Sequence, residues 1–193
     1  MVGPLKIGLI SNPRSNANKK HGGLGARVKP ESDILVSQPS SMDELKQELQ
    51  RFAQEGVELI AIDGGDGTLR DIVSVIHLAY PAQWPSIALL PAGKTNVIAA
   101  HVGSFGKGTA GWHSLLKARK EGTLTKAKTE CPALEVTWPN ENKRLLRGFL
   151  LGSAAFKDGV QMANDSIHPK GIAKSLAVAL AIGGVFRRAM ARK

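Results

Sequence analysis

The sequence is short of several residue types and patterns, and each shortage excludes a class of protein. Its one cysteine, Cys131, excludes an internal disulfide and suits a reducing cytoplasm. Aromatic residues make up 5% of the chain and are not interleaved with basic ones, so we expect no nucleic-acid partner. The five histidines show no metal-ligand spacing. The apolar stretch SLAVALAIGGVF (175–186) is well short of the about 20 residues that a membrane span needs.

Positive charge is concentrated in the later part of the chain. The net charge is +10; residues 1–113 contain 11 Lys and Arg against 10 Asp and Glu, whereas residues 114–193 contain 15 against 6. This asymmetry suits an anionic partner, such as a membrane surface or a phosphate-bearing ligand, and a solvated basic surface is the alternative. We interpret residues 175–186 as a buried helix; a helix lying on a membrane, with the following arginines at the headgroups, is the other interpretation.

The first hundred residues alternate between strand and helix patterns. Short apolar runs at 5–10, 33–36, 57–62 and 86–90 predict strands, and helical periodicity is found at 41–56 and 68–80. Ser41 and Glu44 form a capping-box pattern at the start of the first helix, and Gly56 ends it. This order predicts an α/β fold with a parallel sheet covered on both faces. Its ligand is expected outside the carboxyl ends of the strands, where the loops after residues 10, 62 and 90 converge.

The stretch GGDGT (64–68) joins an apolar strand directly to a helix. Glycines let a phosphate approach the backbone, and the N–H groups at the helix start favour an anion. A carboxylate at Asp66 would repel that anion unless Mg²⁺ lies between them or Asp66 takes a proton. The pattern therefore predicts a phosphate and a metal ion here, and an incidental acid in a glycine-rich turn is the alternative.

Two familiar phosphate-binding motifs fit less well. A dinucleotide fingerprint that starts at Gly65 and Gly67 would need a third glycine where Arg70 stands. The stretch ALLPAGKT (88–95) ends like a P-loop, but Ala88 occupies the position of the first glycine. Neither motif is predicted.

The chain changes character beyond residue 120. LEVTWPNENKRLLRGFLLGS (134–153) predicts two strands joined by the polar turn PNEN, which is an antiparallel hairpin. We expect residues 1–130 to form a nucleotide-binding domain and residues 131–193 to begin a β-rich second domain. Because a lone hairpin is marginal, the second domain is expected to be truncated at its C-terminal end.

Three motifs together resemble the diacylglycerol kinase catalytic domain, a family that includes sphingosine-kinase-like and bacterial lipid kinases. They are NPRSN (12–16), GGDGTLRDIV (64–73) and PAGKTN (91–96), in the family's order and spacing over roughly residues 5–130. GGDGT alone is shared with NAD kinases. The resemblance implies an α/β nucleotide-binding domain followed by a β-rich domain, with the active site between them.

The resemblance also implies roles for individual residues. Asp66 would be the catalytic residue and act through Mg²⁺. The positions that would contact the nucleotide are Asn12, Pro13, Arg14, Ser15, Asn16, Ser37, Gly64, Gly65, Gly67, Thr68, Asp71, Gly93, Lys94, Thr95 and Asn96.

The chain departs from the family pattern at three places. Asp71 stands where the family usually has Glu, Lys94 replaces a hydroxyl, and Val97 replaces a carboxylate. Lys94 either reaches a phosphate or is solvated at a loop tip. Family members also continue into a complete second domain that supplies a late catalytic carboxylate and much of the lipid pocket.

The function implied is an ATP-dependent lipid kinase that transfers the γ-phosphoryl group to a diacylglycerol-like or sphingoid hydroxyl, with ATP as co-substrate and Mg²⁺ as cofactor. The expected location is cytoplasmic, peripheral at the inner membrane face, with self-association through exposed apolar surface. As a truncated fragment, the chain is expected to bind Mg·ATP weakly and to phosphorylate no lipid. A kinase of a soluble substrate, similar to NAD kinase, and a nucleotide-binding module without turnover are the alternatives.

Overall fold

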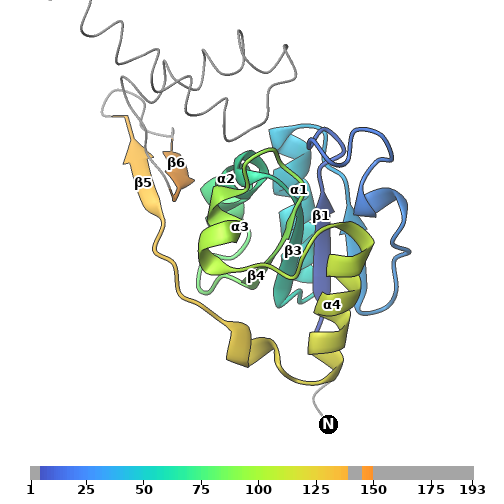
Figure 1. Ribbon diagram of the computed structural model, residues 1–193. Helices are drawn as coiled ribbons and strands as arrows, with labels where there is room; N and C mark the ends of the chain where they lie inside the picture. Colours follow the sequence, from blue (N-terminus) through green and yellow to red (C-terminus); the bar gives the residue numbers. More distant parts are fainter. Residues whose placement is uncertain (1–4, 139–144, 150–193) are drawn as a thin grey trace, which may run out of the picture. The chain divides into compact units, whose positions relative to one another are not determined.

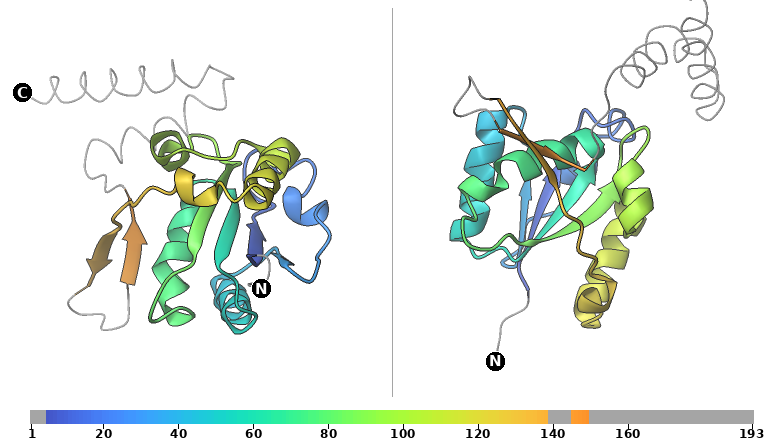
Figure 2. Two further views of the ribbon diagram at one scale, coloured as in Figure 1. Left: turned by 90° about the horizontal axis from the view of Figure 1, so that it is seen from below. Right: turned by 90° about the vertical axis from the view of Figure 1, so that its left-hand side faces the viewer.

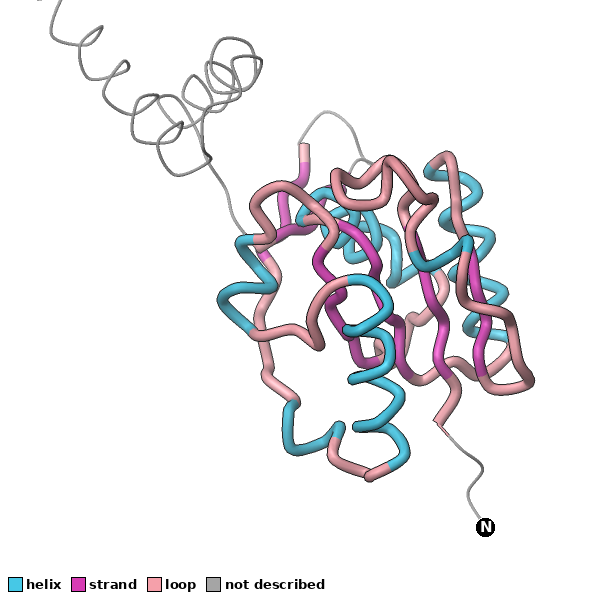
Figure 3. The backbone as a smooth tube through the Cα atoms, turned by 45° about the vertical axis from the view of Figure 1, so that its right-hand side comes forward, coloured by secondary structure: helices cyan, strands magenta, loops and turns pink. Residues whose placement is uncertain are grey.

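The computed structural model describes residues 5–138 and 145–149, which all belong to one compact unit. Four parallel strands form its central sheet in the order β2-β1-β3-β4, and they lie side by side in Figure 3. Figure 1 labels three of them. Their bounds are β1 Ile7–Ser11, β2 Ile34–Ser37, β3 Leu59–Gly64 and β4 Ser86–Pro91. The predicted α/β fold and all four predicted strands are confirmed, each strand to within two residues at either end.

Helices cover both faces of the sheet, as the continuous apolar strands require. On one face α1 (Met42–Gln54) and α2 (Asp66–Val75) bury Phe52 and Ile72 against Ile60 and its neighbours. On the opposite face α4 (Gly108–Lys120) and the short 3₁₀ segment η1 (Leu24–Ala26) pack on a second apolar cluster. The right-hand view of Figure 2 shows α4 on the side of the strands opposite α1 and α2.

The start of α1 follows its sequence signal in part. The Ser41 hydroxyl caps the helix by accepting a hydrogen bond from the Glu44 N–H at 3.2 Å. The Glu44 carboxylate, however, accepts from the backbone N–H of Ser40 at 2.7 Å, one residue before the cap. One half of the predicted capping box is therefore formed as expected and the other is displaced by one residue. Gly56, at φ 73°, ends the segment in the left-handed conformation expected of a terminal glycine.

The second helix begins two residues earlier than predicted and ends sooner. Gly65 is extended and acts as the N-cap, so that Asp66 and Gly67 belong to the first turn of α2. The helix ends at Val75, and a 3₁₀ turn, η2 (Ile76–Leu78), follows. The end of α2 coincides with a run of β-branched residues, which have low helix propensity, and helix ends commonly tighten into 3₁₀ geometry.

The segment after β4 contains α3 (Val97–Val102), and α4 follows after a loop. The 3₁₀ turn η3 (Leu124–Ala127) leads to the predicted antiparallel hairpin, formed by β5 (Leu134–Thr137) and β6 (Leu145–Gly148). Residues 139–144, which contain the whole PNEN turn, and residues 150–193, which contain the predicted apolar helix, lie outside the described residues. Within the part that is described, no helix is long and apolar enough to cross a bilayer.

The hairpin packs against α2 through Arg147. The Ser74 hydroxyl accepts from the Arg147 N–H at 2.9 Å and lies 3.1 Å from the Arg147 carbonyl. The Arg147 guanidinium bonds Glu135 on β5 at 2.8 Å and lies over the Trp84 ring at 5.3 Å from its centroid. It also donates to His77 Nδ1 at 2.8 Å. These contacts fix β6 against the second helix of the parallel-sheet unit.

Candidate functional site at the carboxyl edge of the sheet

The loops that follow β1, β3 and β4 meet at the carboxyl edge of the sheet, as predicted. Backbone hydrogen bonds connect them: Asn12 N–H to Asp63 O at 2.9 Å, and Ala92 N–H to Gly64 O at 2.8 Å. The Ala17 N–H also donates to the Ala92 carbonyl at 2.8 Å, which joins the first loop to the third. The three motif-bearing loops thus form one continuous surface.

The centre of this surface lies between β1 and β3. The chain moves from β1 to β2 in one direction and from β3 to β4 in the other, so the sheet has its topological switch point there. Open α/β sheets bind ligands in the crevice at such a point. The Asn12 side-chain amide crosses this point and donates to the Thr68 hydroxyl at 2.9 Å. Two of the residues predicted to contact the nucleotide, one from the first motif and one from the second, are therefore in direct contact.

Gly65 and Gly93 allow the second and third loops to touch through their backbones. A Cβ added at Gly65 would lie 2.9 Å from the Gly93 Cα, and one added at Gly93 would lie 2.7 Å from the Gly65 Cα. Real Cβ atoms do not approach other carbons so closely. Gly65 and Gly93 were both predicted to contact the nucleotide, and both are also needed for one loop to pack on the other.

The PAGKTN loop is held in a closed turn by Asn96. Asn96 has a left-handed backbone, with φ 52° and ψ 48°, which asparagine adopts more readily than most residues. Its side-chain oxygen accepts from the Gly93 N–H at 2.8 Å, and its amide donates to the Gly93 carbonyl at 3.0 Å. Lys94 and Thr95 are exposed at the tip of this turn.

Asp66 joins α2 to α3. Its Oδ2 accepts from the Thr95 hydroxyl at 3.1 Å and from the Val97 N–H at 3.0 Å. Its Oδ1 accepts from the Ile98 N–H at 3.1 Å. The predicted catalytic carboxylate is thus the cap of the next helix, a role that its position in the sequence does not reveal.

Gly67 differs from the other motif glycines. It is exposed in the first turn of α2, and a Cβ built there would meet no atom within 4 Å. Neither packing nor a positive φ explains glycine at this position, and the open first turn leaves room for an anion at the helix start. A small, mostly apolar pocket lies among the ends of β3 and β4 and the starts of α2 and α3, lined by Ile62, Gly64, Gly65, Asp66, Leu69, Leu89, Leu90, Pro91, Asn96 and Ala99.

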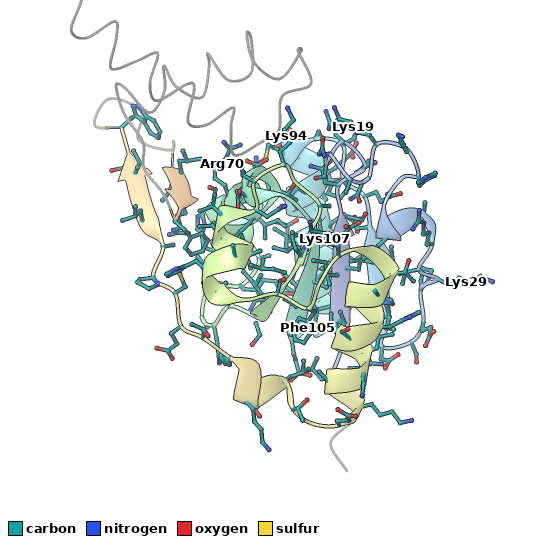
Figure 4. All side chains as sticks on the ribbon, in the orientation of Figure 1. Lys19, Lys29, Arg70, Lys94, Phe105 and Lys107 are labelled. Carbon is teal, nitrogen blue, oxygen red and sulfur yellow. The ribbon has the colours of Figure 1, made fainter. Side chains whose placement is uncertain are left out.

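Some predicted residues lie away from this centre. Ser37 is buried at the end of β2, separated from β3 by β1. Arg14 is exposed and donates to the Ser40 carbonyl. Asp71 forms an ion pair with the neighbouring Arg70 at 2.7 Å. Figure 4 shows Lys19 and Lys94, from the first and third loops, at the carboxyl-edge end of the molecule.

Sequence reasoning missed a fully buried carboxylate at this edge, that of Asp63. Its Oδ2 accepts from the Ser11 hydroxyl, the Asn18 amide and the Leu24 N–H at 2.7, 3.0 and 2.8 Å. The available signal was an acid that ends an otherwise apolar strand.

The side chains at this edge offer few ligands for Mg²⁺. The described residues contain no group of three or more His, Cys, Asp or Glu side chains that could hold a metal ion. A carboxylate offers about four lone-pair positions, and three of those on Asp66 are used, so one position on Oδ1 remains. Mg²⁺ is commonly held by one or two carboxylates together with waters and substrate phosphates. The donor set therefore fits an ion that arrives with a nucleotide.

Comparison with known proteins gives one family match. The diacylglycerol kinase catalytic domain matches residues 6–129. Two crystal structures of proteins from Bacillus anthracis str. Sterne are similar to the chain. One, provisionally described as a diacylglycerol kinase, is 26% identical over 51% of this chain and 36% of its own, with a TM-score of 0.38. The other, described as a diacylglycerol kinase, is 25% identical over 61% and 40%, with a TM-score of 0.44.

The chain thus spans less than half the length of these two structures. No significant match was found among curated proteins. The family match covers well over half of the chain and includes all three loops that meet at the sheet edge. The chain therefore belongs to the diacylglycerol kinase catalytic-domain family.

Proposed function

We propose that this chain is the nucleotide-binding part of an ATP-dependent lipid kinase, which transfers the γ-phosphoryl group of ATP to a diacylglycerol-like or sphingoid hydroxyl. The observation that carries the proposal is the open first turn of α2 at Gly67, placed where three family motifs meet. Phosphoryl transfer is catalysed chiefly by positioning and by stabilising negative charge, and a rigid set of backbone N–H groups supplies both.

On the nucleotide side, the phosphates would lie over the start of α2. The N–H groups of its first turn and the positive end of the helix dipole favour an anion there. The Asn12–Thr68 contact would hold the first loop beside the phosphates, and Asn96 would hold the third. Lys94, at the tip of the third loop, would extend toward the β- and γ-phosphates.

Magnesium fits the same proposal through Asp66. When bound with ATP, the ion would neutralise charge that develops on the transferred phosphoryl group. The remaining lone pair of Asp66 Oδ1 would face it, while the other three stay committed to Thr95, Val97 and Ile98. Asp66 would then hold both the nucleotide's metal ion and the start of α3.

On the acceptor side, the proposal includes a division of the chain near residue 130. The β5–β6 hairpin would begin the lipid-binding domain. The excess of basic residues in 114–193 would attract an anionic membrane surface and bring the enzyme to the inner face of the membrane.

One observation favours a second candidate, a nucleotide-binding module without turnover. Val97 stands where the family has a carboxylate, and it contributes only its N–H to Asp66. A site with a single carboxylate binds a nucleotide-borne ion less firmly than a site with two.

The deciding experiment pairs binding with transfer in the 193-residue chain. Isothermal titration with Mg·ATP measures binding, and radiolabelled ATP with mixed micelles of diacylglycerol and a sphingoid base measures transfer. Labelled lipid supports the kinase. Binding without labelled lipid is expected of the nucleotide-binding part alone; the module is supported if a form with a complete second domain also binds ATP and labels no lipid. Labelled NAD in a parallel reaction would instead indicate a soluble acceptor. Absence of ATP binding contradicts the lipid kinase, the binding module and the kinase of a soluble substrate alike.

A further inference from the structure

Asp63 is a fully buried carboxylate for which the proposed chemistry has no use. It ends β3, directly before the glycine motif, and its side chain is 0% exposed. In the described residues no Lys or Arg forms an ion pair with it. Burying a carboxylate is costly, so its hydrogen bonds must account for its presence.

Those hydrogen bonds come from one stretch of chain. The Ser11 hydroxyl, the Asn18 amide and the Leu24 N–H all donate to Asp63 Oδ2, within 3.0 Å. Ser11 ends β1, Asn18 lies in the middle of the loop after it, and Leu24 begins η1. Asp63 thus contacts the start, middle and end of residues 11–24, which we call the anchored segment.

The backbone of Asp63 holds the same segment. Its carbonyl accepts from the Asn12 N–H at 2.9 Å, and the Asn18 amide lies 3.4 Å from it. Asn18 also donates to the Asn12 carbonyl at 3.0 Å. Asn12 is the residue whose amide reaches Thr68, so Asp63 is one step from the predicted nucleotide contact.

The chain passes over the carboxylate at Gly23. Gly23 has φ 70°, and a Cβ there would lie 2.6 Å from both Asp63 Oδ2 and Asn18 Nδ2. Its neighbour Gly22 has nearly the same φ, 69°, but a Cβ there would meet only the Ala26 Cβ, at 3.0 Å. Two adjacent glycines therefore share one backbone conformation, and only one of them is required by Asp63.

The other carboxylate oxygen argues against a role in stability alone. Asp63 Oδ1 is buried and has no hydrogen-bond partner among the described residues. An unsatisfied buried oxygen lowers stability, and a packed apolar side chain would avoid that cost. An apolar side chain, however, could not accept hydrogen bonds from the three donors of the anchored segment and hold them at one point.

We propose that Asp63 is a positioning residue that fixes the anchored segment against the carboxyl edge of the sheet and so sets the position of Asn12 at the nucleotide site. The anchoring is a property of the apo chain, whereas its effect on ligand binding rests on the proposed function. The two parts are tested by separate measurements.

Anchoring is tested with trypsin. Arg14, Lys19 and Lys20 are exposed cleavage sites inside the segment. In Asp63→Asn a neutral oxygen replaces the charged acceptor, which weakens all three hydrogen bonds. We expect cleavage at these sites to be at least tenfold faster than in the wild type. The matched control is Asp33→Asn, which breaks the 2.8 Å ion pair with Arg119 on α4 and leaves the segment in place. Equal cleavage in the two variants overturns the proposal.

Gly23→Ala provides a second test should Asp63→Asn fail to fold. It keeps the carboxylate and disturbs only the approach of the segment, and Gly22→Ala is its control with the same backbone strain. We expect Gly23→Ala to raise cleavage at the three sites at least fivefold above Gly22→Ala. Equal rates in the two alanine variants contradict the anchoring.

The effect on ligand binding is measured with Mg·ATP and compared at matched stability. We expect the Kd for Mg·ATP to rise at least fivefold in Asp63→Asn and in Gly23→Ala but less than twofold in Asp33→Asn. The urea unfolding midpoint of each variant shows how much of any rise follows from lost stability. If the wild type binds ATP and all three variants weaken in proportion to lost stability, Asp63 is structural only and the proposal fails. If the wild type binds no ATP, the proposed function fails, while the trypsin result still decides the anchoring.

Discussion

The carboxylate of Asp66 accepts a hydrogen bond from the backbone N–H of Ile98 at 3.1 Å, so a residue in the first turn of α2 caps the first turn of α3. Two further donors, from Thr95 and Val97, reach the same carboxylate. The second and third family motifs are thereby joined through one side chain, and changes at Asp66 must affect the third loop as well as any bound metal ion.

Replacing Asp66 by Asn should therefore affect both stability and activity. The variant loses charge-assisted caps to α3, and we expect its free energy of unfolding to fall by about 1–2 kcal/mol. In a form with a complete second domain, phosphoryl transfer should fall by about 10²-fold or more, because the ligand of the nucleotide's metal ion is also lost. Urea unfolding and a transfer assay measure the two effects.

Asp71→Asn is the control for this prediction. Asp71 lies on the same helix, and its ion pair with Arg70 is partly exposed, so the change in stability should stay within about 0.5 kcal/mol. Equal unfolding midpoints for Asp66→Asn and Asp71→Asn would show that the cap of α3 does not depend on this carboxylate.

Lys94 should distinguish nucleotides by their phosphates. A cation at the tip of the third loop near the β- and γ-phosphates would attract ATP more than AMP. We expect Lys94→Met to weaken the binding of ATP about tenfold and the binding of AMP by less than threefold, as measured by calorimetric titration. Lys120→Met, at the far end of α4, should change neither. Equal weakening of both nucleotides, or none, would contradict a contact between Lys94 and the β- and γ-phosphates.

The contact of the hairpin with α2 should weaken in acid. Burial, with the adjacent Arg147 guanidinium, lowers the pKa of His77 below its ordinary value, although Glu135 acts in the opposite direction. The folded state then favours neutral His77, so its contribution to stability is present above about pH 6.5 and is lost as the pH falls through the lower folded pKa. Unfolding free energies measured at about pH 7.5 and about pH 5.5 should differ, and His77→Asn should reduce the difference. An unchanged difference in the variant contradicts this role for His77.

The chain's one tyrosine gives a spectroscopic test of the core beside α1. Burial raises the pKa of Tyr80 to about 12, and its hydroxyl lies 3.3 Å from the Val57 carbonyl. Because the folded pKa is raised, the stability from the neutral phenol is complete below pH 10 and is lost as the pH rises through about 12. Absorbance of the phenolate, with circular dichroism to follow unfolding, should show ionisation well above 10. Ionisation near 10 in the folded protein would contradict the burial.

The sequence was informative where the signal is local or repeated along the chain. Apolar runs predicted all four strands, and their order predicted the edge at which the motifs meet. Ser41 and Gly56 marked the ends of α1 because capping depends on residues a few positions apart.

The remaining features depend on contacts between distant segments. The caps from Asp66 to Val97 and Ile98 follow from how α2 and α3 are placed, and no local pattern encodes that placement. Gly65 and Gly93 resembled phosphate-binding glycines, but the structure also requires them for their mutual contact. The sequence analysis assigned no role to Asp63, since its donors lie up to 52 residues away in the chain.

The proposed function requires nucleotide phosphates to lie over the first turn of α2. The most direct test is a calorimetric titration of Gly67→Ala with Mg·ATP and with adenosine, beside a urea unfolding curve. A methyl group at this position meets no protein atom within 4 Å, and alanine favours a helix over glycine by about 1 kcal/mol, so stability should be unchanged or higher. We predict that the Kd for Mg·ATP weakens at least tenfold while adenosine binding is unchanged. Wild-type affinity for Mg·ATP in a folded Gly67→Ala variant would contradict the account.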